Sequence, residues 1–204
     1  MYELKIKRQI VSEFATNCYL VERNKKCIII DPGASKGEIV RGIEELQAKP
    51  VAIFLTHGHY DHIGAVTELK REYDIPVYAH EEEKDLLKSS ALNLSQMLGL
   101  PISLEADVWV KDNEVIQIED FTFKVIHTPG HTQGSCCFYM EIEKVLFSGD
   151  TLFCCSRGRT DFPTGSESKL IRSIRDKLLV LPEDVKVFAG HNQETTIGDE
   201  KPYY

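Results

Sequence analysis

The stretch Thr56-His57-Gly58-His59-Tyr60-Asp61-His62 decides the fold. It follows a short apolar run at 51–55, which is typical of a buried strand, and it places three imidazoles and one carboxylate within six residues. Burying so many polar groups costs free energy unless something binds them. Nitrogen and oxygen donors of this kind are ligands for zinc, iron or manganese. The stretch therefore predicts a metal site at the end of a strand.

Three other predicted strands run into a glycine beside a potential metal ligand. These segments are Thr128-Pro129-Gly130-His131, Gly149-Asp150 and Gly190-His191. Glycine adopts a positive φ at little cost, so each backbone can turn sharply and aim the next side chain across the sheet ends. The predicted ligands are His57, His59, Asp61, His62, His131, Asp150 and His191. Seven ligands exceed the needs of one tetrahedral ion and suit two ions that share a bridging group.

The apolar pattern changes several times between the period of a strand and that of a helix. Strands are predicted at 3–10, 18–21, 27–30, 51–55, 76–79, 108–110, 115–118, 121–126, 136–140, 145–147 and 185–189. Helices are predicted after a capping box at Ser35, over 63–73, over 81–88 and after a cap at Ser166. The segment 90–106 fits either a helix or a loop. Many strands with few helices between them predict an α+β fold with two sheets and helices outside.

Length and charge limit the classes of protein that fit. The 204 residues carry a net charge of −8, and no basic cluster suggests a nucleic-acid partner. One domain over 1–204 is expected. The longest apolar runs are five residues, whereas a membrane helix needs about 20, so no membrane partner is expected. Because the first nine residues lack the apolar core of a signal peptide, a cytoplasmic location is predicted.

Six cysteines are present, including the neighbouring pair Cys154 and Cys155. An even count does not by itself predict disulfides in a chain long enough to build a core and without an export signal. No Cys-x-x-Cys spacing occurs, so a thiolate zinc site is not predicted. We expect reduced cysteines, with Cys154 and Cys155 contributing to packing.

Three polar residues outside the ligand set have a predicted place. His80 opens a predicted helix and His127 lies just before the segment that carries His131, and both are predicted to be structural. Asp31 ends a predicted strand and is predicted to orient a metal ligand.

The pattern His-x-His-x-Asp-His resembles the signature of the metallo-β-lactamase superfamily. The resemblance extends over almost the whole chain, through Asn17-Cys18-Tyr19-Leu20-Val21, Asp31-Pro32-Gly33, Thr128-Pro129-Gly130-His131-Thr132, Ser148-Gly149-Asp150-Thr151-Leu152-Phe153 and Gly190-His191. Within the superfamily the chain looks most like the hydroxyacylglutathione hydrolases (glyoxalase II) and their short bacterial relatives. These motifs indicate the fold much more specifically than the substrate.

The resemblance implies an αββα sandwich of two mixed β-sheets, with helices on the outer faces and the site at one edge of the sheets. It implies two divalent metal ions, with zinc expected first and iron or manganese as alternatives. The first would bind His57, His59 and His131, the second Asp61, His62 and His191, and Asp150 would bridge them. One group of true β-lactamases has Cys at the bridging position, so Asp150 lowers the expectation of β-lactam hydrolysis.

The resemblance also implies a metallo-hydrolase in which a metal-bound hydroxide attacks the carbonyl of a small-molecule thioester. Asp61 would be catalytic, because it would hold the second metal and accept a hydrogen bond from the nucleophile. Full-length glyoxalase II enzymes carry a C-terminal helical region that binds glutathione. This chain ends at Tyr204, 13 residues after His191, so no such domain is expected and the thiol part of the substrate stays open.

Two other interpretations are considered. The stretch Gly158-Arg159-Thr160-Asp161-Phe162 also resembles persulfide dioxygenases, a mononuclear iron branch in which His57, His131 and Asp150 would form a facial triad. Arg159 would then bind a substrate carboxylate, or it would pair with Asp161 to brace a loop. The remaining interpretation is a binding protein that kept the fold without catalysis, and the presence of every ligand type argues against it.

Overall fold

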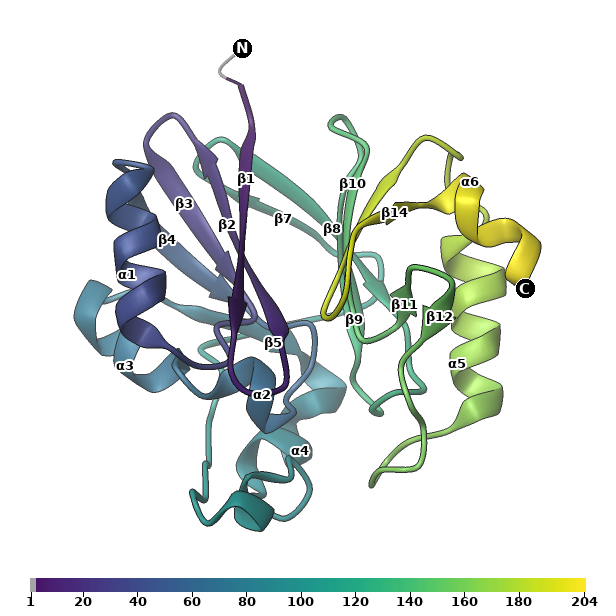
Figure 1. The fold of residues 1–204 in the computed structure, drawn as a ribbon, viewed down its shortest axis with the longest axis horizontal. Helices are drawn as coiled ribbons and strands as arrows, with labels where there is room; N and C mark the ends of the chain where they lie inside the picture. The colour runs from purple at the N-terminus through teal and green to yellow at the C-terminus, as the bar shows by residue number, and fades with distance from the viewer. Residues whose placement is uncertain (1–2) are drawn as a thin grey trace.

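The computed structural model describes residues 3–204 and contains two six-stranded β-sheets that lie face to face (Figure 1). The first sheet has the order β1-β2-β3-β4-β5-β6. Neighbours from β1 to β3 are antiparallel and neighbours from β3 to β6 are parallel, so the sheet is mixed. Its strands are β1 (Lys5–Val11), β2 (Thr16–Arg23), β3 (Lys26–Ile30), β4 (Lys49–Phe54), β5 (Val77–His80) and β6 (Val108–Val110).

The second sheet is also mixed and has the order β14-β13-β10-β9-β8-β7. Strands β10 and β13 are parallel and the other neighbours are antiparallel. A separate hairpin, β11 (Leu152–Phe153) and β12 (Ser156–Arg157), follows β10. The strands of the second sheet are β7 (Val115–Ile118), β8 (Phe121–His127), β9 (Cys136–Met140), β10 (Val145–Gly149), β13 (Lys186–Ala189) and β14 (Thr195–Thr196).

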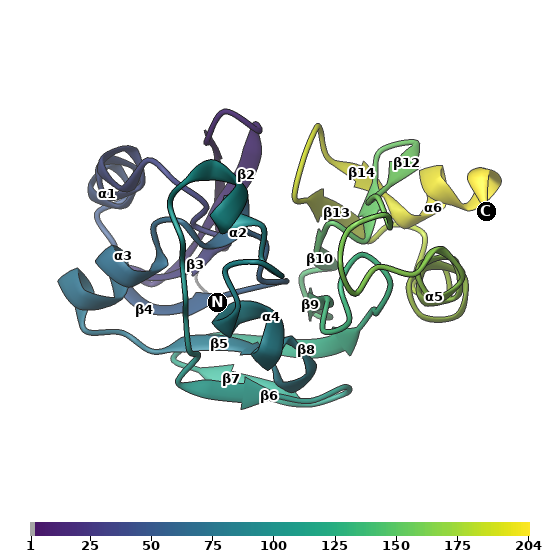
Figure 2. The same cartoon turned by 90° about the horizontal axis from the view of Figure 1, so that it is seen from below.

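Helices cover the outer faces of both sheets. Figures 1 and 2 show α1 (Lys36–Glu45) and α3 (Val66–Tyr73) outside the first sheet, and α5 (Glu167–Ser173) and α6 (Ile197–Glu200) outside the second. The short helices α2 (Tyr60–Ile63) and α4 (Lys84–Lys88) lie at one edge of the sandwich. The predicted αββα sandwich is therefore confirmed. Between residues 3 and 204, no helix combines the length and the apolar character that crossing a membrane requires.

The alternation of side chains along β2 builds two apolar layers at once. Cys18 and Leu20 pack with the residues of α1 and α3, whereas Tyr19 and Val21 face the second sheet. Successive side chains of a strand point to opposite faces, so the middle of a strand covered on both sides is apolar on both faces. All eight positions of β2 are accordingly buried.

Aromatic rings fill the space between the sheets. The Phe54 ring lies 5.0 Å from that of Phe123 and 4.8 Å from that of Phe138, measured between ring centroids. Rings at this spacing add specific contacts to the area they bury. A third apolar layer forms where Leu170 and Ile174 pack against the outer face of the second sheet. The order helix, sheet, sheet, helix follows from these three layers.

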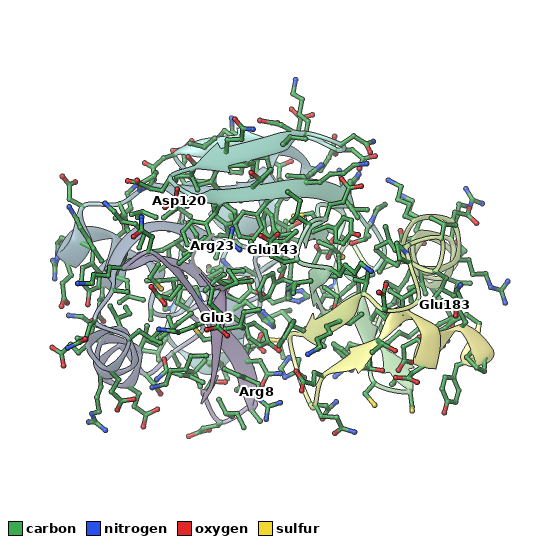
Figure 3. The ribbon with its side chains drawn as sticks, turned by 90° about the horizontal axis from the view of Figure 1, so that it is seen from above. Glu3, Arg8, Arg23, Asp120, Glu143 and Glu183 are labelled. Carbon is green, nitrogen blue, oxygen red and sulfur yellow. The ribbon has the colours of Figure 1, made fainter. Side chains whose placement is uncertain are left out.

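Arg23, at the far end of β2, ties the two sheets together away from the metal ligands. Its guanidinium donates hydrogen bonds to the backbone carbonyl of Asp120 (3.0 Å) and to Glu143 Oε1 (2.5 Å). Figure 3 shows these three residues beside one another. Asp120 and Glu143 belong to turns of the second sheet, so this contact closes the edge of the sandwich opposite Thr16.

The predicted strands are confirmed within two residues at each end, but several helix predictions are wrong in detail. The stripe over 63–73 is two helices, because the Ala65 amide donates to Pro32 O (2.9 Å) at the break between α2 and α3. Ser35 is not a capping box: it has φ of 55° and no capping hydrogen bond from its side chain. The Ser166 side chain does not cap α5 either.

The C-terminal tail contains more structure than its polar sequence indicates. Strand β14 and helix α6 follow each other there, and Thr196 caps α6 by accepting a hydrogen bond from the Asp199 amide (3.1 Å). Elements of two to four residues are too short to show a period in the sequence, so the pattern could not predict them.

Candidate metal centre

The predicted ligands come from the carboxyl ends of four strands that meet at one edge of the sandwich. His57 and His59 follow β4, and His59 is the N-cap residue of α2, which carries Asp61 and His62. His131 follows β8, Asp150 follows β10 and His191 follows β13. The sheets join at this edge, where the Asn17 amide donates to Gly190 O (2.7 Å). All seven predicted ligands are therefore brought together.

Three imidazoles form the first ligand group. His59 Nδ1 lies 2.8 Å and His57 Nε2 lies 3.2 Å from His131 Nε2. The three side chains are buried, and one nitrogen of each lies within 4.8 Å of the others. Nitrogens that converge in this way suit a single cation bound at their centre.

Asp61, His62 and His191 form the second group, again with ligand atoms within 4.8 Å of one another. Asp61 Oδ2 lies 3.5 Å from His62 Nε2 and 3.4 Å from His191 Nε2. His57 and His62 also form a group with Asp31, so the two sets adjoin, and the predicted division of the ligands between two metals stays a prediction.

Asp150 lies between the two groups and contacts both. Its Oδ2 atom is 3.5 Å from His131 Nε2 in the first group and 3.5 Å from His191 Nε2 in the second. Its Oδ1 atom is 3.5 Å from His62 Nε2. A carboxylate with one oxygen near each group is suited to bridge two cations.

Backbone carbonyls and a carboxylate orient the imidazoles. His131 Nδ1 donates to Arg159 O (2.7 Å), His191 Nδ1 donates to Phe14 O (3.1 Å) and His62 Nδ1 donates to an oxygen of Asp31 (3.0 Å). Because each acceptor holds the proton on Nδ1, each Nε2 presents its lone pair to the centre. The predicted role of Asp31 in orienting a ligand agrees with this geometry.

Unpartnered atoms test whether the residues fit a metal. His59 Nε2, His62 Nε2 and Asp150 Oδ1 are buried without a hydrogen-bond partner. Buried polar atoms without a partner are costly, and a cation would satisfy His62 Nε2 and Asp150 Oδ1, which lie 3.5 Å apart. The donor set, made only of nitrogen and oxygen atoms, fits divalent zinc, iron or manganese.

Burial and the nearby carboxylates shift the pKa values of the histidines in opposite directions in the two ligand groups. Burial lowers the pKa of His57 well below its usual range and lowers the pKa of His59 to about 3. Burial acts in the same direction on His62, but the carboxylates of Asp61, Asp150 and Asp31 outweigh it and raise the pKa of His62 to about 9.

The carboxylates of the centre stay ionised. Burial alone would raise the pKa of Asp150, but His62, His191 and His131 lower it to about 2. The pKa of Asp61 is likewise lowered against the effect of burial, by His62, His191 and a hydrogen bond from Thr16. Negative charge is therefore held at neutral pH at the positions where a cation needs it.

Glycine has two different roles in the ligand turns. The expectation of positive φ is confirmed for Gly130 (145°) and Gly149 (49°). Gly58 and Gly190 do not have positive φ, so the expectation is wrong for them. At Gly190 the reason is space, since a Cβ atom would lie 2.2 Å from Asp150 Oδ1 and 2.8 Å from His62 Cε1.

Two residues that support the centre were not identified from the sequence. Glu83 Oε1 accepts a hydrogen bond from the Gly58 amide (2.8 Å), and Oε2 accepts from Thr132 Oγ1 (3.0 Å) and the Gly134 amide (2.8 Å). It thereby joins the two loops of the first ligand group. Thr16 Oγ1 donates to Asp61 Oδ2 (2.8 Å). Glu83 is one of three successive glutamates, and no sequence signal separates it from its exposed neighbours.

Arg159 lies beside the centre with its side chain exposed. The guanidinium binds both carboxylate oxygens of Asp161 (2.7 and 2.5 Å) and lies 4.0 Å above the Phe162 ring. This geometry agrees with the alternative in which Arg159 pairs with Asp161 and braces the loop. A substrate carboxylate would have to displace Asp161, so the substrate contact of Arg159 stays a prediction.

The remaining histidines and cysteines lie outside the seven-ligand set. His80 and His127 stack on each other with ring centroids 4.0 Å apart, which agrees with a structural role. All six cysteines are free. The packing prediction is wrong for Cys154 and Cys155, because Cys155 is exposed and Cys154 is only half-buried in the turn of the β11–β12 hairpin.

A cavity of about 810 Å³ opens beside Asp61. Its walls are largely apolar and include Phe14, Tyr60, Leu98 and Leu100. A mostly apolar cavity that reaches a polar centre is the usual form of a small-molecule site.

Comparison with known proteins identifies the class that the fold and the centre define. The sequence profile of the metallo-beta-lactamase superfamily matches residues 11–191. The chain therefore belongs to the metallo-β-lactamase superfamily. It is 40% identical over 196 residues to hydroxyacylglutathione hydrolase GloC of Haemophilus influenzae, an alignment that covers 94% of this chain and 92% of that protein.

Two solved structures extend the comparison. The crystal structure of BLEG-1, a B3 metallo-beta-lactamase, has a TM-score of 0.92 and 42% sequence identity, and the match covers 97% of each chain. TTHA1623 in a di-iron-bound form has a TM-score of 0.85 and 34% identity, with 95% of this chain and 96% of that chain covered. The similar proteins thus include a hydroxyacylglutathione hydrolase, a β-lactamase and a di-iron protein, so similarity in fold does not by itself identify the substrate or the metal.

Proposed function

We propose that this member of the superfamily is a metal-dependent hydrolase of small-molecule thioesters, of the hydroxyacylglutathione hydrolase type. The observation that carries the proposal is Asp150, which lies between the two ligand groups, 3.5 Å from a histidine nitrogen of each, and whose Oδ1 is buried without a hydrogen-bond partner. The similarity to GloC supports the substrate class.

The proposed metal ligands are the predicted ones. His57, His59 and His131 would hold one ion, Asp61, His62 and His191 the other, and Asp150 would be common to both. Two bound divalent cations would lower the pKa of a water molecule toward neutral pH and polarise a substrate carbonyl. We propose zinc as the resident metal, and the di-iron form of TTHA1623 keeps iron as the alternative.

Asp61 positions the attacking water in this proposal. Thr16 donates to Asp61 Oδ2, which also faces His62 and His191, so Oδ1 is the carboxylate oxygen left to accept a hydrogen bond from the water. The hydrogen bonds from Nδ1 of His62, His131 and His191 keep these imidazoles in one orientation during the reaction.

A thioester suits the groups that surround the centre. A thiolate is a stable leaving group and needs little protonation, and the proposed mechanism therefore needs no separate general acid. The cavity beside Asp61, with Phe14, Tyr60 and Leu98 in its walls, would receive an apolar part of the substrate.

Measurement of metal content and substrate turnover tests the proposal. We expect two metal ions per chain by elemental analysis and hydrolysis of S-lactoylglutathione. One iron per chain with oxygen uptake on glutathione persulfide would instead support the mononuclear dioxygenase. Because BLEG-1 is similar, a β-lactam should be assayed in parallel. Hydrolysis of the β-lactam without thioester cleavage would overturn the proposal.

A further inference from the structure

A second cluster of potential metal ligands lies in the hairpin that follows Asp150. Cys154 and Cys155 form the two-residue turn between β11 and β12, in which Phe153 pairs with Ser156. Cys155 has φ of 55°, a left-handed conformation that is uncommon for residues other than glycine. Cys155 is exposed and Cys154 is half-buried, so a solvated ion can reach the turn.

Glu200 of α6 brings a carboxylate to the same turn. It is fully buried, and both of its oxygens accept a hydrogen bond from the Cys155 amide (3.1 and 2.9 Å). Oε1 accepts a further hydrogen bond from Thr195 Oγ1 (2.6 Å). Oε2 has no second hydrogen bond and keeps a lone pair for another partner.

We propose that Cys154, Cys155 and Glu200 form a separate site for a thiophilic divalent cation, such as Zn²⁺ or Cd²⁺. Their ligand atoms lie within 4.8 Å of one another. The two sulfur atoms are 3.9 Å apart. Two thiolates bound at about 2.3 Å to a tetrahedral zinc ion are roughly 3.8 Å apart, so the turn already has the spacing of a chelate.

The donor set distinguishes this site from the centre. Two thiolates and one carboxylate favour a soft or borderline cation, whereas the centre offers only nitrogen and oxygen. The fourth position is open to water or to the Tyr203 hydroxyl, which lies 3.4 Å from Cys155 Sγ. Each thiol that binds the ion releases its proton to solvent.

Chelation fits the turn better than a disulfide does. Adjacent Cα atoms are about 3.8 Å apart across a trans peptide, below the roughly 4.4–6.8 Å of ordinary disulfides.

The site is close to the centre but shares no residue with it. Gln193 Nε2 donates to Cys154 Sγ (3.4 Å), and the Phe153 ring meets His191 edge-on at 5.9 Å. The inference does not depend on the proposed hydrolase activity.

Cadmium titration of the reduced full chain, loaded with two zinc ions per chain so that the thiolate site is left free, tests the proposal. We expect a thiolate-to-cadmium charge-transfer band in the ultraviolet that saturates at one Cd²⁺ per chain. Displacement of zinc from the centre cannot give this band, because the centre contains no sulfur. The band should be lost in C154S and in C155S, and the zinc content of the centre should be unchanged in both variants.

Glutamate variants test the third ligand. Glu200→Gln should raise the Kd for Cd²⁺ roughly tenfold or more, whereas Glu194→Gln, on an exposed residue nearby, should leave it unchanged. Glu200 is buried, and its variant can fail to fold. The variants C154S and C155S, at the solvent-accessible turn, therefore test the two thiolate ligands independently of the Glu200 variant. A missing band, a band that survives both serine variants, or an unchanged Kd in a folded E200Q protein would overturn the three-ligand site.

Discussion

Asp31 shows how one buried side chain fixes several parts of the centre. Its Oδ1 atom accepts a hydrogen bond from the Thr56 amide (2.8 Å), and its Oδ2 atom accepts from Thr56 Oγ1 (2.6 Å) and His62 Nδ1 (3.0 Å). The end of β4 and the imidazole of α2 are thereby held by one carboxylate. Asp31 thereby sets the direction of the His62 imidazole, one of the proposed metal ligands.

Removal of a ligand from the second group should abolish hydrolysis and leave the fold intact. We expect Asp61→Ala and His62→Ala each to lower kcat/KM by about 100-fold or more, because changes even in residues behind a ligand cost 10–100-fold. Metal content should fall from two ions toward one. Circular dichroism checks the fold, and Asp85→Ala, on an exposed carboxylate of α4, is the control. Normal turnover in both ligand variants would contradict the two-metal mechanism.

Glu83 should make stability depend on pH. Burial raises the pKa of Glu83 from 4.5 to about 7, although three hydrogen-bond donors act against this. Between these two values the folded chain holds a proton that the unfolded chain has lost, so the free energy of unfolding should fall as pH rises. Across this pH range the free energy of unfolding should fall by about 3 kcal/mol in total.

Urea denaturation of the metal-loaded protein from pH 4.5 to 8 measures this dependence. The loss of stability with rising pH should be smaller in Glu83→Gln than in the wild type, and Glu82→Gln should follow the wild type because Glu82 is exposed. Parallel curves for the wild type and E83Q would show that Glu83 does not titrate in this range.

At the scale of elements, close contact between a ligand loop and α5 sets the position of His131. The Ser166 amide donates to Gly130 O (2.7 Å), which joins the start of α5 to the loop. A Cβ atom at Gly130 would lie 2.3 Å from the Leu170 amide nitrogen. The loop and the helix can approach this closely only because residue 130 has no side chain.

Gly130→Ala should therefore destabilise the protein by about 2 kcal/mol or more, because it combines a backbone clash with an unfavourable positive φ. Gly37→Ala is the matched control: nothing lies within 4 Å of its Cβ position in α1, and we expect it to stabilise by roughly 0.5–1 kcal/mol. Chemical denaturation compares the two. Equal stability of the two variants would argue against the contact between loop and helix.

At the scale of the molecule, the proposed metals connect the two halves of the sandwich. The ligands His57, His59, Asp61 and His62 come from the first sheet and its following helix, whereas His131, Asp150 and His191 come from the second sheet. Ions held by both halves would stabilise their association, because a ligand that binds only the folded state stabilises that state.

Removal of the metals should lower the thermal stability of the whole molecule. A free metal concentration 100 times the Kd contributes about 2.7 kcal/mol, which corresponds to a decrease in Tm of roughly 5–10 °C for a chain of this size. Calorimetry with and without a chelator measures the change, and added Zn²⁺ should restore the Tm. The decrease should be smaller in His62→Ala. No change in Tm would mean that the metals do not join the halves.

The sequence by itself determined the longer strands and the seven candidate ligands, and its resemblance to a known superfamily implied the sandwich. Strands of both sheets alternate or are apolar throughout, and four imidazole or carboxylate segments follow strand ends; both are local patterns. What the sequence could not show is which distant groups meet. Glu83 looks like its exposed neighbours, and Thr16 has no motif, until the loops of both sheets close around them.

Only the tertiary structure decided the supporting contacts. The break between α2 and α3 depends on the carbonyl of Pro32. The Cys154–Cys155 turn of the β11–β12 hairpin is held beside α6 by the hydrogen bond from the Cys155 amide to Glu200. Such contacts join residues that are tens of positions apart. No periodicity or spacing along the chain records them, because they arise when packed layers bring separate turns to the same edge.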